Sequence, residues 1–214
     1  IFRNPLIPGD YEIIDGNMVI YGNRTGKWRL DSNPQNGFPG QTILEVSMKS
    51  TITGITIPGS RSGVGMWLNV DSSDIQGETG EYGALNFHTI LRSDNTQYVE
   101  FISDWTPGQE WPPASYLRVE GDGVTSFNDG FITIQLVIEP NDITNKIDVD
   151  YTISDSAGTT ATGTMNMNRR TSTIEGYRVA TILTGGDTGE IDYVYLDGVY
   201  ATEYDVNNDN FINF

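Results

Sequence analysis

The chain has 214 residues with 12 Lys and Arg against 29 Asp and Glu, which gives a formal net charge of −17 at pH 7. Such an acidic chain has no basic stripe that could release the counterions of DNA or RNA, so the composition excludes a generic nucleic-acid binder. The absence of cysteine excludes disulfides, thiolate nucleophiles and thiolate metal sites. No apolar run approaches the roughly 18 residues of a membrane-spanning helix, so we expect no membrane span.

Short alternating segments are separated by Gly, Asn, Asp and Ser at intervals of roughly 8 to 15 residues, which is typical of sandwiches and jelly rolls. No segment has a convincing helical period. We therefore predict an all-β chain in which residues 1–204 form a single antiparallel β-sandwich. The predicted strands are Tyr11–Ile14, Met18–Tyr21, Trp28–Leu30, Thr42–Met48, Gly65–Val70, Ala84–Arg92, Gln97–Ser103, Tyr116–Glu120, Gly130–Glu139, Lys146–Ser154, Thr159–Asn166, Tyr177–Thr184 and Ile191–Tyr200.

Turn-forming residues predict three local hairpins, at 15–17, 93–96 and 155–158. The second hairpin contains the only histidine of the chain, and its two arms alternate as half-buried strands do. One face is predicted to join the core. The other face gathers Asn86, His88, Arg92, Tyr98 and Glu100.

The core prediction follows from alternating apolar residues, which must share one face of a strand. It comprises Leu44, Val46, Leu85, Phe87, Val99, Phe101, Ile132, Ile134, Leu136, Val149, Tyr151, Val179, Val194 and Leu196.

Four apolar segments follow one another in the second half of the chain, at 130–138, 147–153, 177–183 and 189–200. Their succession, with the acidic strand Ile-Asp-Tyr-Val near the end, resembles the closing half of a concanavalin-like (laminin-G-like) jelly roll. The resemblance covers about Thr42 to Tyr200. It implies that fold, and it leaves the function open because this fold carries many activities.

The C-terminal segment 205–214 places oxygen ligands at alternate positions, Asp205, Asn207 and Asp209, as calcium loops do. It resembles the start of a dockerin-type loop of bacterial extracellular proteins. Asn210 stands where glycine is usual, and the chain ends two residues before the twelfth position of such a loop. We therefore expect the half-loop not to close, and residues 205–214 to be a truncated tail or linker. The alternative is an ordinary polar C-terminus.

The pair Asn86-x-His88 resembles the Gln-x-His pair of jelly-roll polysaccharide lyases of the alginate-lyase type. That resemblance implies that Asn86 neutralises a uronate carboxylate and that His88 removes the C5 proton. Tyr177 or Tyr98 would protonate the leaving oxygen. The carboxylate would be gripped by Arg92 or Arg178. Asparagine in place of glutamine departs from the family pattern, and the alternative is a structural histidine.

Aromatic side chains offer a second kind of site, because sugar rings stack on aromatic faces. The candidates are Trp67, Tyr98, Trp105, Trp111 and Tyr116. Trp105 and Trp111 stand in a loop, which favours exposure and binding. The alternative is that these rings plug the ends of the sandwich. Loop carboxylates could also hold a structural calcium ion, and they are Asp71, Asp74, Glu120, Asp122 and Asp129.

Three functions remain open from the sequence. The first is a non-catalytic extracellular or cell-surface module that binds a polysaccharide or surface glycan. The second is a polysaccharide lyase that cleaves a uronate-containing glycan by β-elimination. The third is a filament or surface-layer subunit, in which Ile1–Pro8 and Phe211–Phe214 add as strands to a neighbouring sheet.

Overall fold

A computed structural model describes residues 11–21, 28–30, 41–52, 61–68, 85–103, 116–121, 126–128, 130–141, 143–144, 146–168, 177–182, 188–197 and 211–213. All regular structure in these residues is β-strand, and every strand pair is antiparallel, so the predicted fold class is confirmed.

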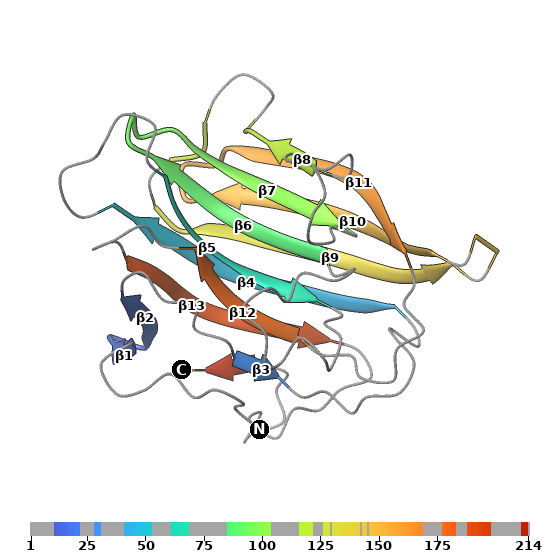
Figure 1. The fold of residues 1–214 in the computed structure, drawn as a ribbon, viewed down its shortest axis with the longest axis horizontal. Coiled ribbons are helices and arrows are strands. Elements are labelled where there is room, and N and C mark those ends of the chain that lie inside the picture. The colour runs from blue at the N-terminus through green and yellow to red at the C-terminus, as the bar shows by residue number, and fades with distance from the viewer. Residues whose placement is uncertain are drawn as a thin grey trace, which may run out of the picture.

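The strands form two sheets (Figure 1). Sheet A has the order β1 (Tyr11–Ile14), β2 (Asn17–Tyr21), β13 (Thr188–Asp197), β4 (Thr42–Thr51), β9 (Ile132–Asn141), β10 (Lys146–Asp155) and β11 (Thr160–Asn168), with β14 (Phe211–Asn213) also paired to β13. Sheet B has the order β3 (Trp28–Leu30), β12 (Tyr177–Ile182), β5 (Arg61–Leu68), β6 (Leu85–Arg92), β7 (Gln97–Ser103) and β8 (Tyr116–Val119).

The core lies between the inner faces of these sheets, because alternate residues of each strand are apolar and point to one side. β10 shows the pattern plainly, with every second residue from Ile147 to Ile153 buried. The predicted core is confirmed for Leu44, Val46, Leu85, Phe87, Val99, Phe101, Ile132, Ile134, Leu136, Val149, Tyr151 and Val194. The side chains of Val179 and Leu196 lie outside the described part.

The three predicted hairpins form with the expected turn geometry. Asp15 and Gly16 have φ of 53° and 87°, as the two central residues of a type I′ turn require. Asn95 (φ 63°) and Gly158 (φ 89°) take the left-handed conformation in the other two turns.

Several strand boundaries differ from the prediction, most of them by one to three residues. β5 begins at Arg61 instead of Gly65, because pairing with β6 and β12 on both sides overrides the weak strand preference of Ser62 and Gly63. β13 begins at Thr188, three residues early. β14 forms where Phe211–Phe214 was expected to add as a strand to a neighbouring sheet, but its partner is different, because Phe211–Asn213 pairs with Tyr193–Tyr195 of the same chain.

A buried polar contact joins the two sheets near one end of the core. The Ser50 hydroxyl of β4 donates to the Thr89 carbonyl oxygen of β6 (3.0 Å) and accepts from the Val64 backbone N–H of β5 (3.1 Å). The sheets approach closely here, since a Cβ on Gly189 of β13 would lie 2.9 Å from Cβ of Val64.

Candidate functional site

Two neighbouring rows of residues cross sheet B and contain most of the predicted site. The first row pairs Arg178, Trp67, Asn86, Ile102 and Tyr116 across β12, β5, β6, β7 and β8. The second row, two residues along each strand, pairs Gly65, His88, Glu100 and Arg118. Residues paired in this way share a face of the sheet, which is the face turned away from the core and is called here the outer face of sheet B.

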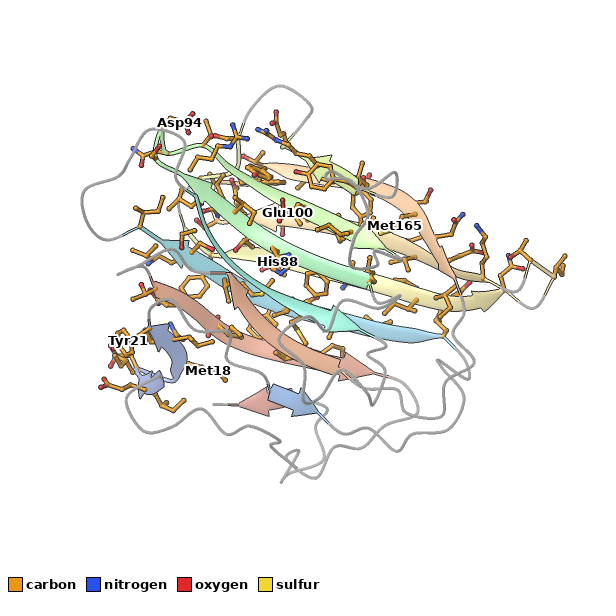
Figure 2. The ribbon with its side chains drawn as sticks, viewed as in Figure 1. Met18, Tyr21, His88, Asp94, Glu100 and Met165 are labelled. Carbon is orange, nitrogen blue, oxygen red and sulfur yellow. The ribbon has the colours of Figure 1, made fainter. Side chains whose placement is uncertain are left out.

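His88, Glu100 and Tyr116 form a cluster on this face, and Figure 2 shows His88 and Glu100 close together in the middle of the molecule. His88 Nδ1 lies 3.9 Å from Glu100 Oε1, the distance of an ion pair rather than of a hydrogen bond. The Tyr116 hydroxyl donates to Glu100 Oε2 at 3.3 Å. The imidazole of His88 and the phenol of Tyr116 therefore meet at the carboxylate of Glu100.

The centre of this outer face is buried rather than open to solvent. His88 is 1% exposed, Glu100 0% and Tyr98 1%, while Ile90 and Ile102 are also buried. The physical reason can be read from the sequence: two isoleucines and a tyrosine stand among the polar residues, so this face is apolar enough to be covered. Tyr98 consequently has no open ring face on which a sugar could stack.

Two guanidinium groups lie on the Tyr98 ring. The Arg118 carbon Cζ is 4.1 Å from the ring centroid and the Arg92 Cζ is 5.2 Å from it. Arg118 also forms an ion pair with Glu120. Arg118 is exposed, and Arg92 and Tyr116 are partly exposed. A ligand on this face would therefore meet these three side chains, while Tyr98, Glu100 and His88 support them from beneath.

Gly65 makes room for the imidazole. A Cβ at this position would overlap the backbone oxygen of Phe87 and lie 2.7 Å from Cγ of His88. The ring of His88 therefore covers the glycine backbone of the neighbouring strand, which no residue with a side chain would allow.

No protein-family model matches this sequence, and no curated protein matches it. Solved structures do match the fold. Alginate lyase Aly36B superposes with a TM-score of 0.58 at 13% identity, covering 92% of this chain and 86% of the lyase. The legume lectin-like domain from Entamoeba histolytica gives 0.54 at 12% identity over 92% and 96% of the two chains. The exoplasmic/lumenal domain of VIP36 gives 0.51 at 12% identity over 95% and 86%.

The fold is a concanavalin-like jelly roll. At these identities the likeness establishes the architecture, and the function must be argued from the site.

The remaining predicted site residues do not all belong to the outer face of sheet B. Tyr177 pairs with Leu68, which in turn pairs with Leu85, so by register Tyr177 stands in a row on the core side of sheet B. The next residue, Arg178, stands in the row of Asn86 on the outer side. Tyr116, which the lyase hypothesis did not name, also stands in the row of Asn86, whereas its two candidates for the acid, Tyr177 and Tyr98, do not. Trp105 and Trp111 lie outside the described residues, as do the side chains of Trp67 and Asn86.

Metal-binding residues are not brought together within the described part of the jelly roll, where no group of three or more His, Asp or Glu side chains could hold an ion. Asp205, Asn207 and Asp209 lie outside that part, and Glu120 pairs with Arg118. The described part of the chain also contains no helix with the length and hydropathy of a membrane span.

Sequence reasoning missed Arg118 and Gly65 and gave Glu100 no role. The signal for Glu100 was present, because the turn at 93–96 fixes the hairpin register and places Glu100 directly opposite His88. Arg118 lies on β8 and Gly65 on β5, and no short turn in the sequence indicates which strands pair with these two.

Burial and the charge of Glu100 raise the pKa of Tyr116 to about 12. Its hydroxyl is therefore protonated near neutral pH, so it can donate a hydrogen bond or a proton but cannot act as a base. On the outer face of sheet A, burial and the hydrogen bond from the Tyr193 hydroxyl to Glu45 (2.7 Å) raise the pKa of Tyr193 to about 12 as well.

Alkaline pH should therefore destabilise the protein. A pKa raised above its unfolded value contributes stability that is complete below pH 10 and is lost as pH rises through about 12. Because both rings are partly exposed, we expect about 1 kcal/mol from each. Urea unfolding below pH 10 and near pH 12 measures this loss. It should be smaller in Tyr116→Phe and in Tyr193→Phe, and equal losses in all three proteins would contradict the two shifts.

Proposed function

We propose that this jelly roll is a carbohydrate-binding module of the cell exterior, and that its glycan binds at the accessible part of the outer face of sheet B, where Arg92, Tyr116 and Arg118 lie. The observation that carries the proposal is the arrangement of Tyr116, Arg92 and Arg118, which lie accessible above a buried support. Guanidinium groups donate hydrogen bonds to sugar hydroxyls and carboxylates, and the Tyr116 hydroxyl oxygen, whose proton is donated to Glu100, can accept from a sugar hydroxyl.

The buried support reduces the entropy that these side chains lose when they bind. Tyr98 stacks beneath both guanidinium groups, and Glu100 accepts from the Tyr116 hydroxyl. Side chains that are already held in place lose less freedom on binding, and this raises affinity without additional contacts. Arg118 and Arg92 bring two guanidinium groups to this face, and because a guanidinium group binds a carboxylate through two parallel hydrogen bonds, they favour acidic over neutral glycans.

The ligands of two structural neighbours agree with a glycan partner. A variant of Aly36B, which superposes with a TM-score of 0.57, was solved in complex with an alginate tetrasaccharide. The VIP36 domain was solved with Ca²⁺ and Man3GlcNAc bound. Calcium belongs to this proposal as a structural ion, for which the loop carboxylates Asp71, Asp74, Asp122 and Asp129, all outside the described residues, are the candidate ligands.

A polysaccharide lyase is the second candidate, and the His88–Glu100–Tyr116 cluster favours it. In β-elimination a base takes the C5 proton, the C4–C5 double bond forms, the bond from C4 to the leaving oxygen breaks, and an acid protonates that oxygen. Neutral Tyr116 suits the acid and His88 the base. We rank this function second because His88 is 1% exposed, so a substrate proton is out of its reach in this structure.

Calorimetric titration with alginate, glucuronan and neutral mannan oligosaccharides tests the proposal, with and without calcium. We expect the acidic glycans to bind, and Arg118→Ala to weaken binding at least about tenfold. Lys49→Ala is the matched control, because Lys49 on sheet A likewise lies over an aromatic ring (Phe131, 5.7 Å) and pairs with a glutamate (Glu190, 3.5 Å).

Three results would contradict the proposed module. The first is equal weakening by Arg118→Ala and Lys49→Ala, and the second is no binding at all. The third is the appearance of an unsaturated product in the ultraviolet spectrum that is lost in His88→Ala, which would establish the lyase instead.

A further inference from the structure

The two sheets end in edge strands of very different character. In the described part of the chain these are β1, β14 and β11 for sheet A and β3 and β8 for sheet B. Four of them, β1, β14, β3 and β8, have only three or four residues, and all of these but β14 contain a charged residue: Glu12, Arg29 and Arg118. Short charged edges resist pairing with other chains. β11 has nine residues, Thr-Ala-Thr-Gly-Thr-Met-Asn-Met-Asn, with no charge and no proline.

The free edge of β11 presents its backbone groups in a regular series. The Asp155 backbone N–H donates to the Thr159 carbonyl oxygen (3.1 Å), which marks this pair as hydrogen-bonded in the ladder. Hydrogen-bonded and non-hydrogen-bonded pairs alternate along an antiparallel ladder. With the register Ser154↔Thr160, the N–H and C=O groups of Thr160, Thr162, Thr164 and Asn166 therefore point away from β10, and no described strand pairs with them.

We propose that β11 is a dimerisation edge, where it pairs antiparallel with β11 of a second copy of this chain, centred on Gly163. This register joins the outward hydrogen-bonding groups of Thr160 to Asn166 of the second copy, and those of Thr162 to Thr164. Each such pair forms two backbone hydrogen bonds. On the outer face it sets exposed threonine against threonine or asparagine, and on the inner face it sets Ala161 against Met165 of the second copy.

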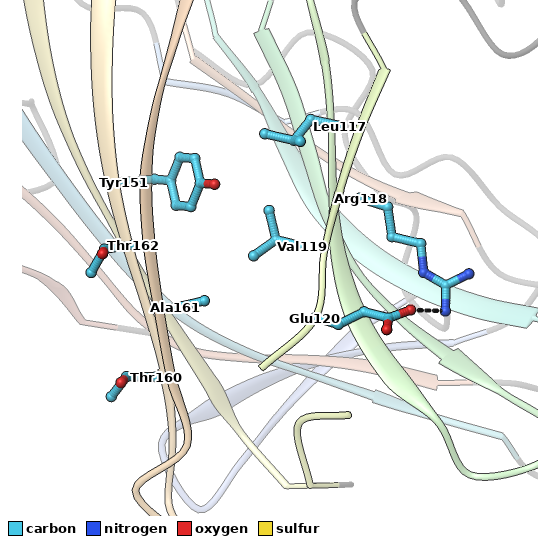
Figure 3. A pocket seen from close by; sticks show the side chains of 8 residues that line it. All are labelled: Leu117, Arg118, Val119, Glu120, Tyr151, Thr160, Ala161 and Thr162. Atoms are coloured by element: carbon cyan, nitrogen blue, oxygen red, sulfur yellow. Dashed lines mark ion pairs between the residues drawn. The ribbon is translucent and has the colours of Figure 1, made fainter. Parts of the chain in front are cut away.

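The self-pairing also covers an open cleft beside this edge. A cleft of about 430 Å³ lies between β8 and β11, lined on its apolar side by Leu117, Val119, Tyr151 and Ala161 (Figure 3). Arg118 and Glu120 point away from the Tyr151 side of β8 and pair with each other. In the proposed register Met165 of the second copy lies directly opposite Ala161, so an apolar side chain is added at the mouth of this cleft.

Charge explains why this edge, rather than another, joins two copies. Two chains of net charge −17 repel each other, and the repulsion is least where the contact itself carries no charge. Salt screens the remaining repulsion, because the Debye length is about 10 Å at 0.1 M and shorter above that. The association should therefore strengthen as ionic strength rises. Because the contact is the same on both copies, it closes as a dimer and does not continue as a filament.

Sedimentation velocity of the full chain at micromolar concentration tests the proposal. We expect a species of twice the monomer mass, and a Kd that rises about tenfold or more in Thr164→Lys, because a lysine would stand in the pairing edge. Thr152→Lys is the matched control: Thr152 is exposed on the same face, one strand inward, and pairs with Thr162.

Thermal unfolding of both variants confirms that any loss of the dimer is not a loss of the fold. Three outcomes would overturn the proposal: a wild-type monomer throughout the micromolar range, a Thr164→Lys protein that dimerises as the wild type does, or a Thr152→Lys protein that is a folded monomer. The dimer does not depend on the proposed glycan, so it stands or fails separately from carbohydrate binding.

Discussion

Glu100→Ala is expected to lower the free energy of unfolding by about 3–5 kcal/mol, because it removes one member of a buried polar group and leaves the others in place. Glu100 is 0% exposed, and its carboxylate accepts from the Tyr116 hydroxyl (3.3 Å) and faces His88 Nδ1 (3.9 Å). After truncation the phenol and the imidazole lose this carboxylate, and a cavity remains beneath Tyr116.

Glu45→Ala provides the matched control for this experiment. Glu45 also accepts from a tyrosine hydroxyl (Tyr193, 2.7 Å) and from an amide (Gln135, 2.8 Å), but it is only partly buried on the outer face of sheet A. We expect its removal to cost about 1 kcal/mol. Urea unfolding with an unchanged m-value measures both losses. An equal cost for the two variants would show that Glu100 is accessible to water.

The sequence predicted those features that follow from alternation and from turns. Phe87 and Phe101 were assigned to the core from periodicity alone, and their rings lie 6.2 Å apart inside it. Asp15 and Gly16 identified the first turn because few residues accept positive φ. Both signals are local, since each depends on residues that are neighbours in the chain.

Features that depend on distant segments were not predictable in the same way. Phe211–Phe214 was expected to pair with a neighbouring sheet, whereas Phe211–Asn213 pairs with β13 of the same chain, and a three-residue segment does not indicate its partner. The burial of His88 depends on what covers the outer face of sheet B, and the alternation of apolar and polar residues along a strand does not predict that. The only sign of this burial in the sequence is that Ile90 and Ile102 stand among the polar residues of the outer face.

The glycine in the middle of β5 is the position at which one methyl group should matter most for the site. Gly65 lies opposite His88, and an added Cβ would overlap the Phe87 carbonyl oxygen and the imidazole ring. The β6 backbone cannot retreat, because β7 holds it from the other side. We therefore expect Gly65→Ala to cost about 3 kcal/mol and to weaken glycan binding by displacing His88 from beneath the site.

Gly130→Ala is the control for this substitution, because its Cβ would come no closer than 3.0 Å to the Asn128 side-chain oxygen and 3.5 Å to the Ser156 hydroxyl, so a shift of a few tenths of an ångström in side chains makes room for it. We expect it to cost under about 1 kcal/mol. The double variant Gly65→Ala/His88→Ala then separates the two obstacles by a mutant cycle. If the imidazole is the main obstacle, Gly65→Ala will cost clearly less in the His88→Ala background than in the wild type. An unchanged cost assigns the strain to the Phe87 carbonyl, and a Gly65→Ala protein as stable as Gly130→Ala would contradict the close packing of β5 against His88.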